Sequence, residues 1–181
     1  AFAIHEKERG GFLGGNGEGK TTILKLLTGE LTPDEGNIIR KSGLSLGYLE
    51  QSGGFTSEAT VYGAMEELFE EDRQLIARLR ATEADMVTAD EEQMRVLSAR
   101  AESLNKRIAA RDSYHYDVRI RTVLGGMGFE RLYDQKVSTM SGGERTKLKL
   151  CRLLLEEPEL LVLDEPTTHL DPTNLIMLED Y

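Results

Sequence analysis

The sequence lacks several features that would point to particular classes of protein. It has a single cysteine, Cys151, which cannot form an internal disulfide, so a secreted disulfide-stapled scaffold is excluded. No apolar run approaches the roughly 20 residues that a membrane-spanning helix needs. Basic residues are outnumbered, 22 to 32, and a net charge of −10 argues against a general nucleic-acid-binding protein.

The N-terminal region also lacks the apolar stretch of a secretory signal, because charged residues fill positions 6–9. Apolar residues make up 39% of the 181 residues and charged residues 30%, a balance typical of a folded domain rather than a disordered chain. We therefore expect a cytoplasmic protein. Ala1–Ile4 has the pattern of a strand already under way and Asp171–Asn174 that of a helix start, so we expect a fragment of a longer chain.

Short apolar stretches between glycines predict strands in the first 50 residues and a helix between them. The expected strands are 1–4, Phe12–Leu13, 37–41 and 44–49, and the expected helix follows Lys20 and ends at Gly29. Towards the other end, 143–156 has a helical pattern. The apolar run 160–163 after it is typical of a parallel strand buried on both faces.

The middle of the chain, from about residue 61 to 124, has helical periodicity. Apolar residues share one face of a first helix (Met65, Leu68, Leu75, Leu79, Met86) and form an alternating three-and-four seam in a second (Met94, Leu97, Ala101, Leu104, Ile108). We expect an antiparallel hairpin at about 66–112, turning near 85–90, with Thr88 and Glu91 as a capping box. A third helix, capped by Asp112 or Ser113, is expected to end at Gly125–Gly126.

A glycine loop between the predicted strand and helix has phosphate-loop spacing. The sequence is Gly14, Gly15, Asn16, Gly17, Glu18, Gly19, Lys20, Thr21, Thr22. Its glycines let backbone amides turn inward around phosphates, and the helix presents its positive end to the same anion. Lys20 adds a charge and Thr21 a hydroxyl suited to Mg²⁺. A glycine-rich turn with an exposed lysine is the plain alternative.

Two carboxylates, Asp164 and Glu165, follow the predicted strand 160–163. Ligands of open α/β sheets bind at this carboxyl edge. Asp164 can hold Mg²⁺ directly or through water, and Glu165 can activate a water molecule beside a phosphate. The alternative is a strand that simply ends in solvated charges.

A third motif, Ser141, Gly142, Gly143, Glu144, precedes a predicted helix and suits either an anion site or an ordinary N-cap. The ordered set of phosphate loop, Gln51, this motif, Asp164–Glu165 and Thr168–Asp171 resembles the nucleotide-binding domain of ATP-binding cassette (ABC) proteins. The resemblance implies an α/β fold: a P-loop NTPase core of ABC ATPase type with an α-helical subdomain carrying a helical-hairpin insertion. Residues 1–53 and 138–181 would form the core and 54–137 the subdomain.

The resemblance also implies the role of each motif. Residues 14–22 would be the Walker A loop, which binds ATP, and 141–144 the signature motif, which completes the ATP site of a second cassette. Asp164 would be the Walker B aspartate, a Mg²⁺ ligand with Thr21. Gln51 would sense Mg²⁺ and the attacking water, and Glu165 would be the catalytic base. One cassette alone is expected to bind ATP and to turn over poorly.

Three features resemble the soluble ABC-F subfamily rather than transporter cassettes. Residues 168–171 read Thr-His-Leu-Asp, one residue from that subfamily's Asn-His-Leu-Asp, and the signature continues Glu144-Arg145. The 89 residues between Gln51 and Ser141 leave room for the arm hairpin of an ABC-F first cassette. The resemblance implies a second cassette as partner, and the ribosome as client in translation or antibiotic resistance. An ABC transporter subunit is the alternative.

The predicted hairpin departs from what an RNA-binding arm requires. Residues 66–112 hold eight basic and twelve acidic side chains, whereas binding RNA phosphates calls for an excess of positive charge. A solvated hairpin with an apolar seam therefore stays open beside the ribosome-binding arm. Gly10 and Gly15 stand where the family usually has larger residues, so the strand and loop here gain flexibility.

Overall fold

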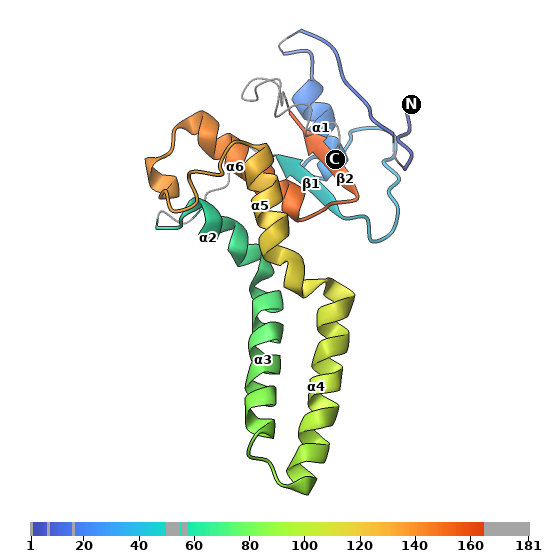
Figure 1. Cartoon of the computed structure of the whole chain (residues 1–181). Coiled ribbons are helices and arrows are strands. Elements are labelled where there is room, and N and C mark those ends of the chain that lie inside the picture. Colours follow the sequence, from blue (N-terminus) through green and yellow to red (C-terminus); the bar gives the residue numbers. More distant parts are fainter. Residues whose placement is uncertain (1, 7, 16, 50–54, 56–57, 165–181) are drawn as a thin grey trace. The chain divides into compact units, whose positions relative to one another are not determined.

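The computed structural model describes residues 1–181 except 1, 7, 16, 50–54, 56–57 and 165–181. The chain divides into two compact units (Figure 1). We call residues 1–50 with 158–166 the strand unit, and residues 51–157 with 167–181 the helical unit. Each is described by itself.

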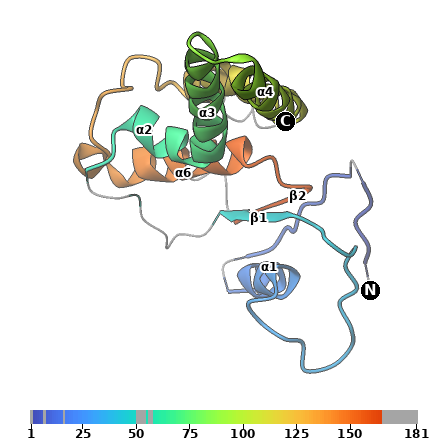
Figure 2. The same cartoon turned by 90° about the horizontal axis from the view of Figure 1, so that it is seen from below.

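The strand unit is built on helix α1 (Lys20–Thr28) and two parallel strands, β1 (Leu46–Leu49) and β2 (Leu160–Leu163). Leu46 lies opposite Leu160 and Leu49 opposite Leu163. Helix α1 lies along one side of this pair and contacts β2 (Figure 2). Leu24 on α1 and Val162 on β2 are the buried apolar side chains of these elements.

Three of the predicted strands do not form. Residues 1–4, 12–13 and 37–41 are not strands where the structure describes them, and the strand predicted at 44–49 is limited to β1. Leu13 is fully exposed and Ile39 is 93% exposed. A strand is stable only beside a partner with an apolar face to bury, and these segments bury too little. The prediction of strands here was wrong.

The helical unit contains α2 (Val61–Glu66), α3 (Glu70–Met86), α4 (Glu91–Arg111), α5 (Tyr116–Gly126) and α6 (Gly142–Leu155). Three short 3₁₀ helices join them: η1 (Glu67–Phe69), η2 (Ser113–His115) and η3 (Val137–Thr139). Helix α6 packs against α2 and α5. Their fully buried side chains form this unit's core: Met65, Ile120, Leu124, Leu148, Leu150, Cys151 and Leu154.

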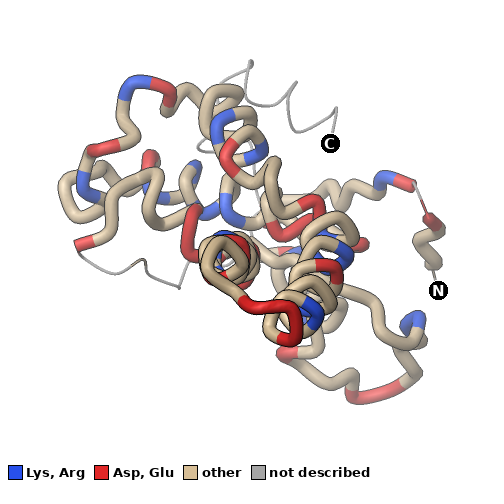
Figure 3. Tube along the Cα trace, turned by 60° about the horizontal axis from the view of Figure 1, so that its bottom comes forward, with Lys and Arg blue, Asp and Glu red and all other residues tan. Residues whose placement is uncertain are grey.

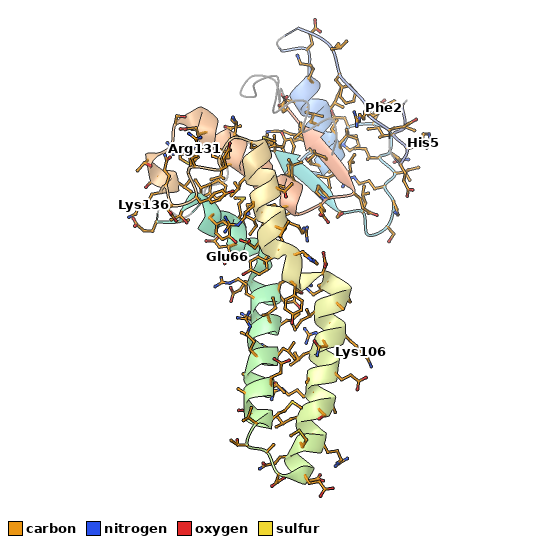
Figure 4. The ribbon with its side chains drawn as sticks, in the orientation of Figure 1. Phe2, His5, Glu66, Lys106, Arg131 and Lys136 are labelled. Carbon is orange, nitrogen blue, oxygen red and sulfur yellow. The ribbon has the colours of Figure 1, made fainter. Side chains whose placement is uncertain are left out.

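The predicted hairpin is confirmed as the antiparallel pair α3 and α4. Four residues of the expected apolar seam, Leu75, Leu79, Leu104 and Ile108, form its core together with Ile76, which was not expected, and Ala101 and Tyr116 pack against it. Met65 and Leu68, expected on the same helix face, lie in α2 and η1 instead. Acidic residues gather at the turn that joins the two helices (Figure 3). On the outer side of α4, Lys106 pairs with Glu102 at 2.7 Å and projects into solvent (Figure 4).

The capping box predicted for α4 lies two residues further along the chain. Asp90 is the N-cap, and its carboxylate accepts a hydrogen bond from the Gln93 amide at 2.8 Å. The Gln93 side chain accepts in return from the Asp90 amide at 3.1 Å. Thr88 and Glu91 do not form the box, because residues 87–89 are taken up by the turn that follows α3.

The base of the hairpin holds a buried carboxylate, Asp72, which is only 4% exposed. The Arg111 guanidinium donates to both of its oxygens, at 3.0 and 3.2 Å, and the Ser113 hydroxyl donates to one of them. Burial raises the pKa of Asp72, but the hydrogen bonds from Arg111 and Ser113 outweigh it and hold the pKa below its ordinary value. This cluster ties the first turn of α3 to the end of α4.

Among the described residues, the two compact units differ from the expected boundaries in one stretch. Residues 138–157, expected in the core, group here with the helices because α6 buries its apolar face against α2 and α5. Residues 158–164, which include β2, group with β1 and α1 as expected for a strand of the core.

Candidate functional site

The glycine loop leads directly into the N-terminus of α1. Gly17 and Gly19 have φ of 85° and 86°, a left-handed conformation that favours glycine at both positions. Gly19 is the N-cap of α1, and no capping side chain accepts a hydrogen bond from the first amides of the helix. The N-terminus of α1 therefore presents backbone donors and the positive end of the helix dipole at one place, which is the arrangement that binds anions.

Lys20, the first residue of α1, folds its side chain back over the loop. Its Nζ donates to the carbonyl oxygens of Gly14 at 2.7 Å and Gly15 at 2.9 Å. The ammonium is thus held at the loop as a point charge, where it can also face an anion bound by the loop amides. The side chain is half-buried.

Thr21 and Asp164 come together across 143 residues of sequence. The Thr21 hydroxyl donates to Asp164 Oδ2 at 2.7 Å. Asp164 follows β2 immediately, and Thr21 lies in the first turn of α1, so the contact of α1 with β2 brings them together. Two of the residues expected to act on one metal ion therefore lie side by side.

The oxygens of Thr21 and Asp164 fit the chemistry of Mg²⁺. This ion prefers oxygen ligands, and adjacent ligands of its octahedron lie about 2.9 Å apart. No group of three or more His, Cys, Asp or Glu side chains forms a metal cage among the described residues. Mg²⁺ commonly needs no such cage, since one or two protein oxygens combine with water and the phosphates of a nucleotide.

The motif at 141–144 opens α6 in the helical unit. Ser141 is the N-cap, and its amide and hydroxyl donate to Glu144 Oε2 at 2.8 and 2.7 Å. The Glu144 amide donates to Ser141 Oγ at 3.3 Å. The hydroxyl of Ser141 holds the pKa of Glu144 below its ordinary value. The N-cap is confirmed and is part of a full capping box, whereas the anion site at this motif stays a prediction.

Several predicted site residues lie outside the described part of the chain. These are Asn16 of the loop, Gln51, Glu165 and the stretch Thr168–Asp171. Their assigned roles stay predictions. Within the described residues, the strand unit brings together Gly14, Lys20, Thr21 and Asp164.

One contact in the loop was not foreseen from the sequence. Glu18 Oε2 accepts a hydrogen bond from the Gly15 amide at 2.8 Å. The sequence offered one signal for this contact. Glu18 follows Gly15 by three residues, and Gly15 stands where the family usually has a larger residue.

Cys151 and His115 are titratable groups outside the candidate site. Cys151 is fully buried, and burial raises the pKa of its thiol. His115 is exposed and contacts Asp112. Of the helices in the described residues, none is long and apolar enough to cross a membrane.

A family model described as "ABC transporter" matches residues 1–168. The chain therefore belongs to the ATP-binding cassette family, whose members are ATPases that use ATP and Mg²⁺. Its fold is an α/β P-loop core of ABC ATPase type with a helical subdomain that carries a hairpin.

Two curated relatives indicate the branch of the family. The tylosin resistance ATP-binding protein TlrC of Streptomyces fradiae is 41% identical over 184 residues, which cover 100% of this chain and 33% of TlrC. The energy-dependent translational throttle protein EttA of Escherichia coli K12 is 34% identical over 171 residues, 94% of this chain and 30% of EttA. These are ABC-F proteins, and this chain is most similar to that subfamily. It spans about a third of their length.

Among solved structures, a metal-chelate type ABC transporter in an inward-facing conformation is similar with a TM-score of 0.50 and 22% identity. The match covers 93% of this chain and 54% of that one. At this identity the similarity shows the fold alone.

Proposed function

We propose that this chain binds ATP with Mg²⁺ and hydrolyses it, as the first cassette of an ABC-F protein that acts as an ATP-driven switch. The observation that supports this best is the 2.7 Å hydrogen bond from Thr21 in the loop to Asp164 at the end of β2. It unites the two motifs that the family uses for Mg²⁺ and nucleotide. The lysine folded over the same loop adds the charge that phosphates need.

Each residue has a proposed role in this reaction. The amides of 14–22 and the Lys20 ammonium bind the β- and γ-phosphates, while Thr21, Asp164 and Gln51 hold the metal. The bound Mg²⁺ supplies charge neutralisation for the phosphates. Glu165 accepts a proton from the attacking water, a contribution of roughly 10²–10⁴ in rate. Positioning and charge rather than covalent chemistry therefore carry the reaction.

The signature residues 141–144 are proposed to serve a second cassette rather than this loop. In that arrangement the donors at the N-terminus of α6 face the γ-phosphate bound by the partner cassette. The second cassette is either in the same protein or a second copy of this chain. A single cassette then binds ATP and turns it over slowly, because its own ATP site lacks the partner's signature motif.

The proposed client is the ribosome, in translation or antibiotic resistance. The names of EttA, a translational throttle, and TlrC, a tylosin resistance protein, support this. In this proposal the hairpin α3–α4 is the arm of an ABC-F first cassette. The runner-up is an ATP-binding subunit of an ABC transporter; a membrane-spanning protein that co-purifies with the chain, in place of ribosomes, would favour it.

The test of the enzyme is a pair of substitutions in the full-length protein. Glu165→Gln should keep ATP binding and lower turnover at least 100-fold, because the general base is lost. Lys20→Ala should abolish ATP binding. Equilibrium ATP binding and phosphate release measure the two effects, and Glu35→Gln, an exposed carboxylate of the strand unit, is the control that should change neither.

Unchanged turnover in Glu165→Gln would overturn the assignment of the base. Unchanged ATP binding in Lys20→Ala would overturn the assignment of the phosphate loop.

A further inference from the structure

The peptide unit between Gly14 and Gly15 is held from both sides by charged side chains. Its carbonyl, that of Gly14, accepts from the Lys20 ammonium at 2.7 Å. Its amide, that of Gly15, donates to the Glu18 carboxylate at 2.8 Å. The structure thus places one positive and one negative side chain on the two ends of one peptide dipole.

The two contacts lie on opposite sides of the loop backbone. No described peptide bond is cis, and in a trans peptide the carbonyl and the amide hydrogen point in opposite directions. Lys20, which is proposed to face the phosphates, is therefore on one side of this peptide and Glu18 on the other. A carboxylate behind the loop supports it without occupying the side on which Lys20 lies.

The glycines make room for this carboxylate. A Cβ added at Gly14 would clash with Glu18 Oε2, and one at Gly15 would lie 3.3 Å from Glu18 Oε1. Glu18 therefore fills the space that a side chain at position 15 would take. It also turns its own amide onto the Gly15 carbonyl at 3.3 Å, so both polar groups of Gly15 are bonded.

We propose that Glu18 is a positioning residue of the nucleotide site, which braces the flexible Gly14–Gly15 peptide and thereby holds the Lys20 ammonium in place. The brace replaces the stiffness that a larger residue at position 15 provides. This inference rests on the proposal that residues 14–22 bind the phosphates of ATP. It assigns the Glu18 carboxylate a role that acts through the loop backbone and Lys20, with no contact between that carboxylate and the nucleotide.

The brace and simple charge repulsion predict opposite effects on ATP affinity when the Glu18 carboxylate is removed. Glu18→Ala should weaken ATP binding roughly three- to tenfold, the effect of losing one ordinary hydrogen bond, because Gly15 and Glu18 are both exposed to solvent. If the carboxylate acted only as a negative charge near the phosphates, its removal would strengthen binding instead. Glu18→Gln keeps an acceptor oxygen for the Gly15 amide and should retain most of the affinity.

The test is a double-substitution cycle at positions 15 and 18, with the ATP dissociation constant measured by calorimetry in the full-length protein. Gly15 has no positive φ, so alanine fits its backbone conformation. In the Glu18→Ala background, Gly15→Ala should recover roughly two- to fivefold in affinity, because it stiffens the loop directly. In the presence of Glu18 it should give no gain, since the new Cβ crowds the carboxylate.

Two controls separate the brace from other causes. Glu35→Ala removes the same charge from the strand unit at an exposed site and should leave ATP binding unchanged. The unfolding temperature should not change in Glu18→Ala, because Gly15 and Glu18 are both exposed. Without nucleotide, the Gly15 amide should exchange its proton faster in Glu18→Ala, which NMR can follow even if nucleotide affinity is too weak to measure.

The outcomes distinguish this inference from the proposed function. Weaker binding in Glu18→Ala, retention in Glu18→Gln and recovery by Gly15→Ala support the brace. Equal or tighter binding in Glu18→Ala, with unchanged Gly15 exchange, overturns it and leaves ATP binding intact. Failure of the unaltered protein to bind ATP overturns the proposed function and the inference together.

Discussion

At the scale of single residues, the site depends on short polar contacts to atoms that the backbone places. Thr21, Lys20 and Asp164 could each be predicted from the sequence as candidate site residues, because their residue types and spacing suit phosphate and Mg²⁺. The partners of those side chains could not. Lys20 binds the Gly14 and Gly15 carbonyls because of the conformation of the loop itself. The contact of Thr21 with Asp164 depends on how α1 meets β2, which no local pattern specifies.

Cys151 gives a test of packing at a single residue. Its side chain is fully buried and burial raises the pKa of its thiol, so the reactive thiolate is scarce at neutral pH. We expect Ellman's reagent to modify it only at the rate at which α6 opens or the protein unfolds. Urea should restore fast, stoichiometric reaction. Complete modification within seconds in native buffer would show that α6 is not packed as described.

At the scale of elements, the long helices were predictable and the short strands were not. The hairpin followed from a seam that repeats over two helices, so a single misread position does little harm. Strands of four residues, such as β1, depend on a partner far along the chain, and local apolar stretches such as 12–13 and 37–41 gave false signals. The N-cap of α4 was misplaced because Thr88 and Asp90 are both good caps by composition.

The base of the hairpin should be sensitive to the charge of Asp72. We expect Asp72→Asn to lower the free energy of unfolding by about 1–3 kcal/mol, a value limited by the partial exposure of Arg111. Urea titrations monitored by circular dichroism measure this. The matched control is Glu102→Gln, which breaks the exposed pair with Lys106 and should have no measurable effect.

The same cluster gives a pH dependence of defined sign. The folded pKa of Asp72 is lowered, so its contribution is complete above the unfolded pKa, near 4, and is lost as the pH falls through the folded value. The stability difference between the unaltered protein and Asp72→Asn should therefore shrink from pH 7 towards pH 3. A difference that stays constant over that interval would contradict the role of the ionised carboxylate.

At the scale of the whole molecule, charge constrains how the protein can meet its proposed client. The chain carries a net −10, and 66–112 has four more acidic than basic residues. Its acidic turn between α3 and α4 (Figure 3) is unsuited to RNA phosphates. The composition therefore favours basic ribosomal protein as the contact of this hairpin.

We expect ATP-dependent pelleting of the full-length Glu165→Gln protein with ribosomes to depend only weakly on salt. Each neutralised phosphate contributes about −0.7 to −0.9 to the slope of log affinity against log salt concentration. A slope shallower than about −2 fits contact through protein, whereas a steep slope would show that RNA phosphates carry the binding. Removing the hairpin, with α3 and α4 replaced by a short linker, identifies which part of the slope belongs to it.

The contact of Thr21 with Asp164 also sets an order of events during synthesis. The hairpin closes between neighbouring helices, so it can form as soon as α4 has left the ribosomal tunnel. The nucleotide site cannot, because Thr21 and β1 wait for residues 160–164, which emerge more than 100 residues later. Non-local pairings of this kind form slowly, so a nascent chain exposes its glycine loop long before Asp164 is there to accept the hydrogen bond of Thr21.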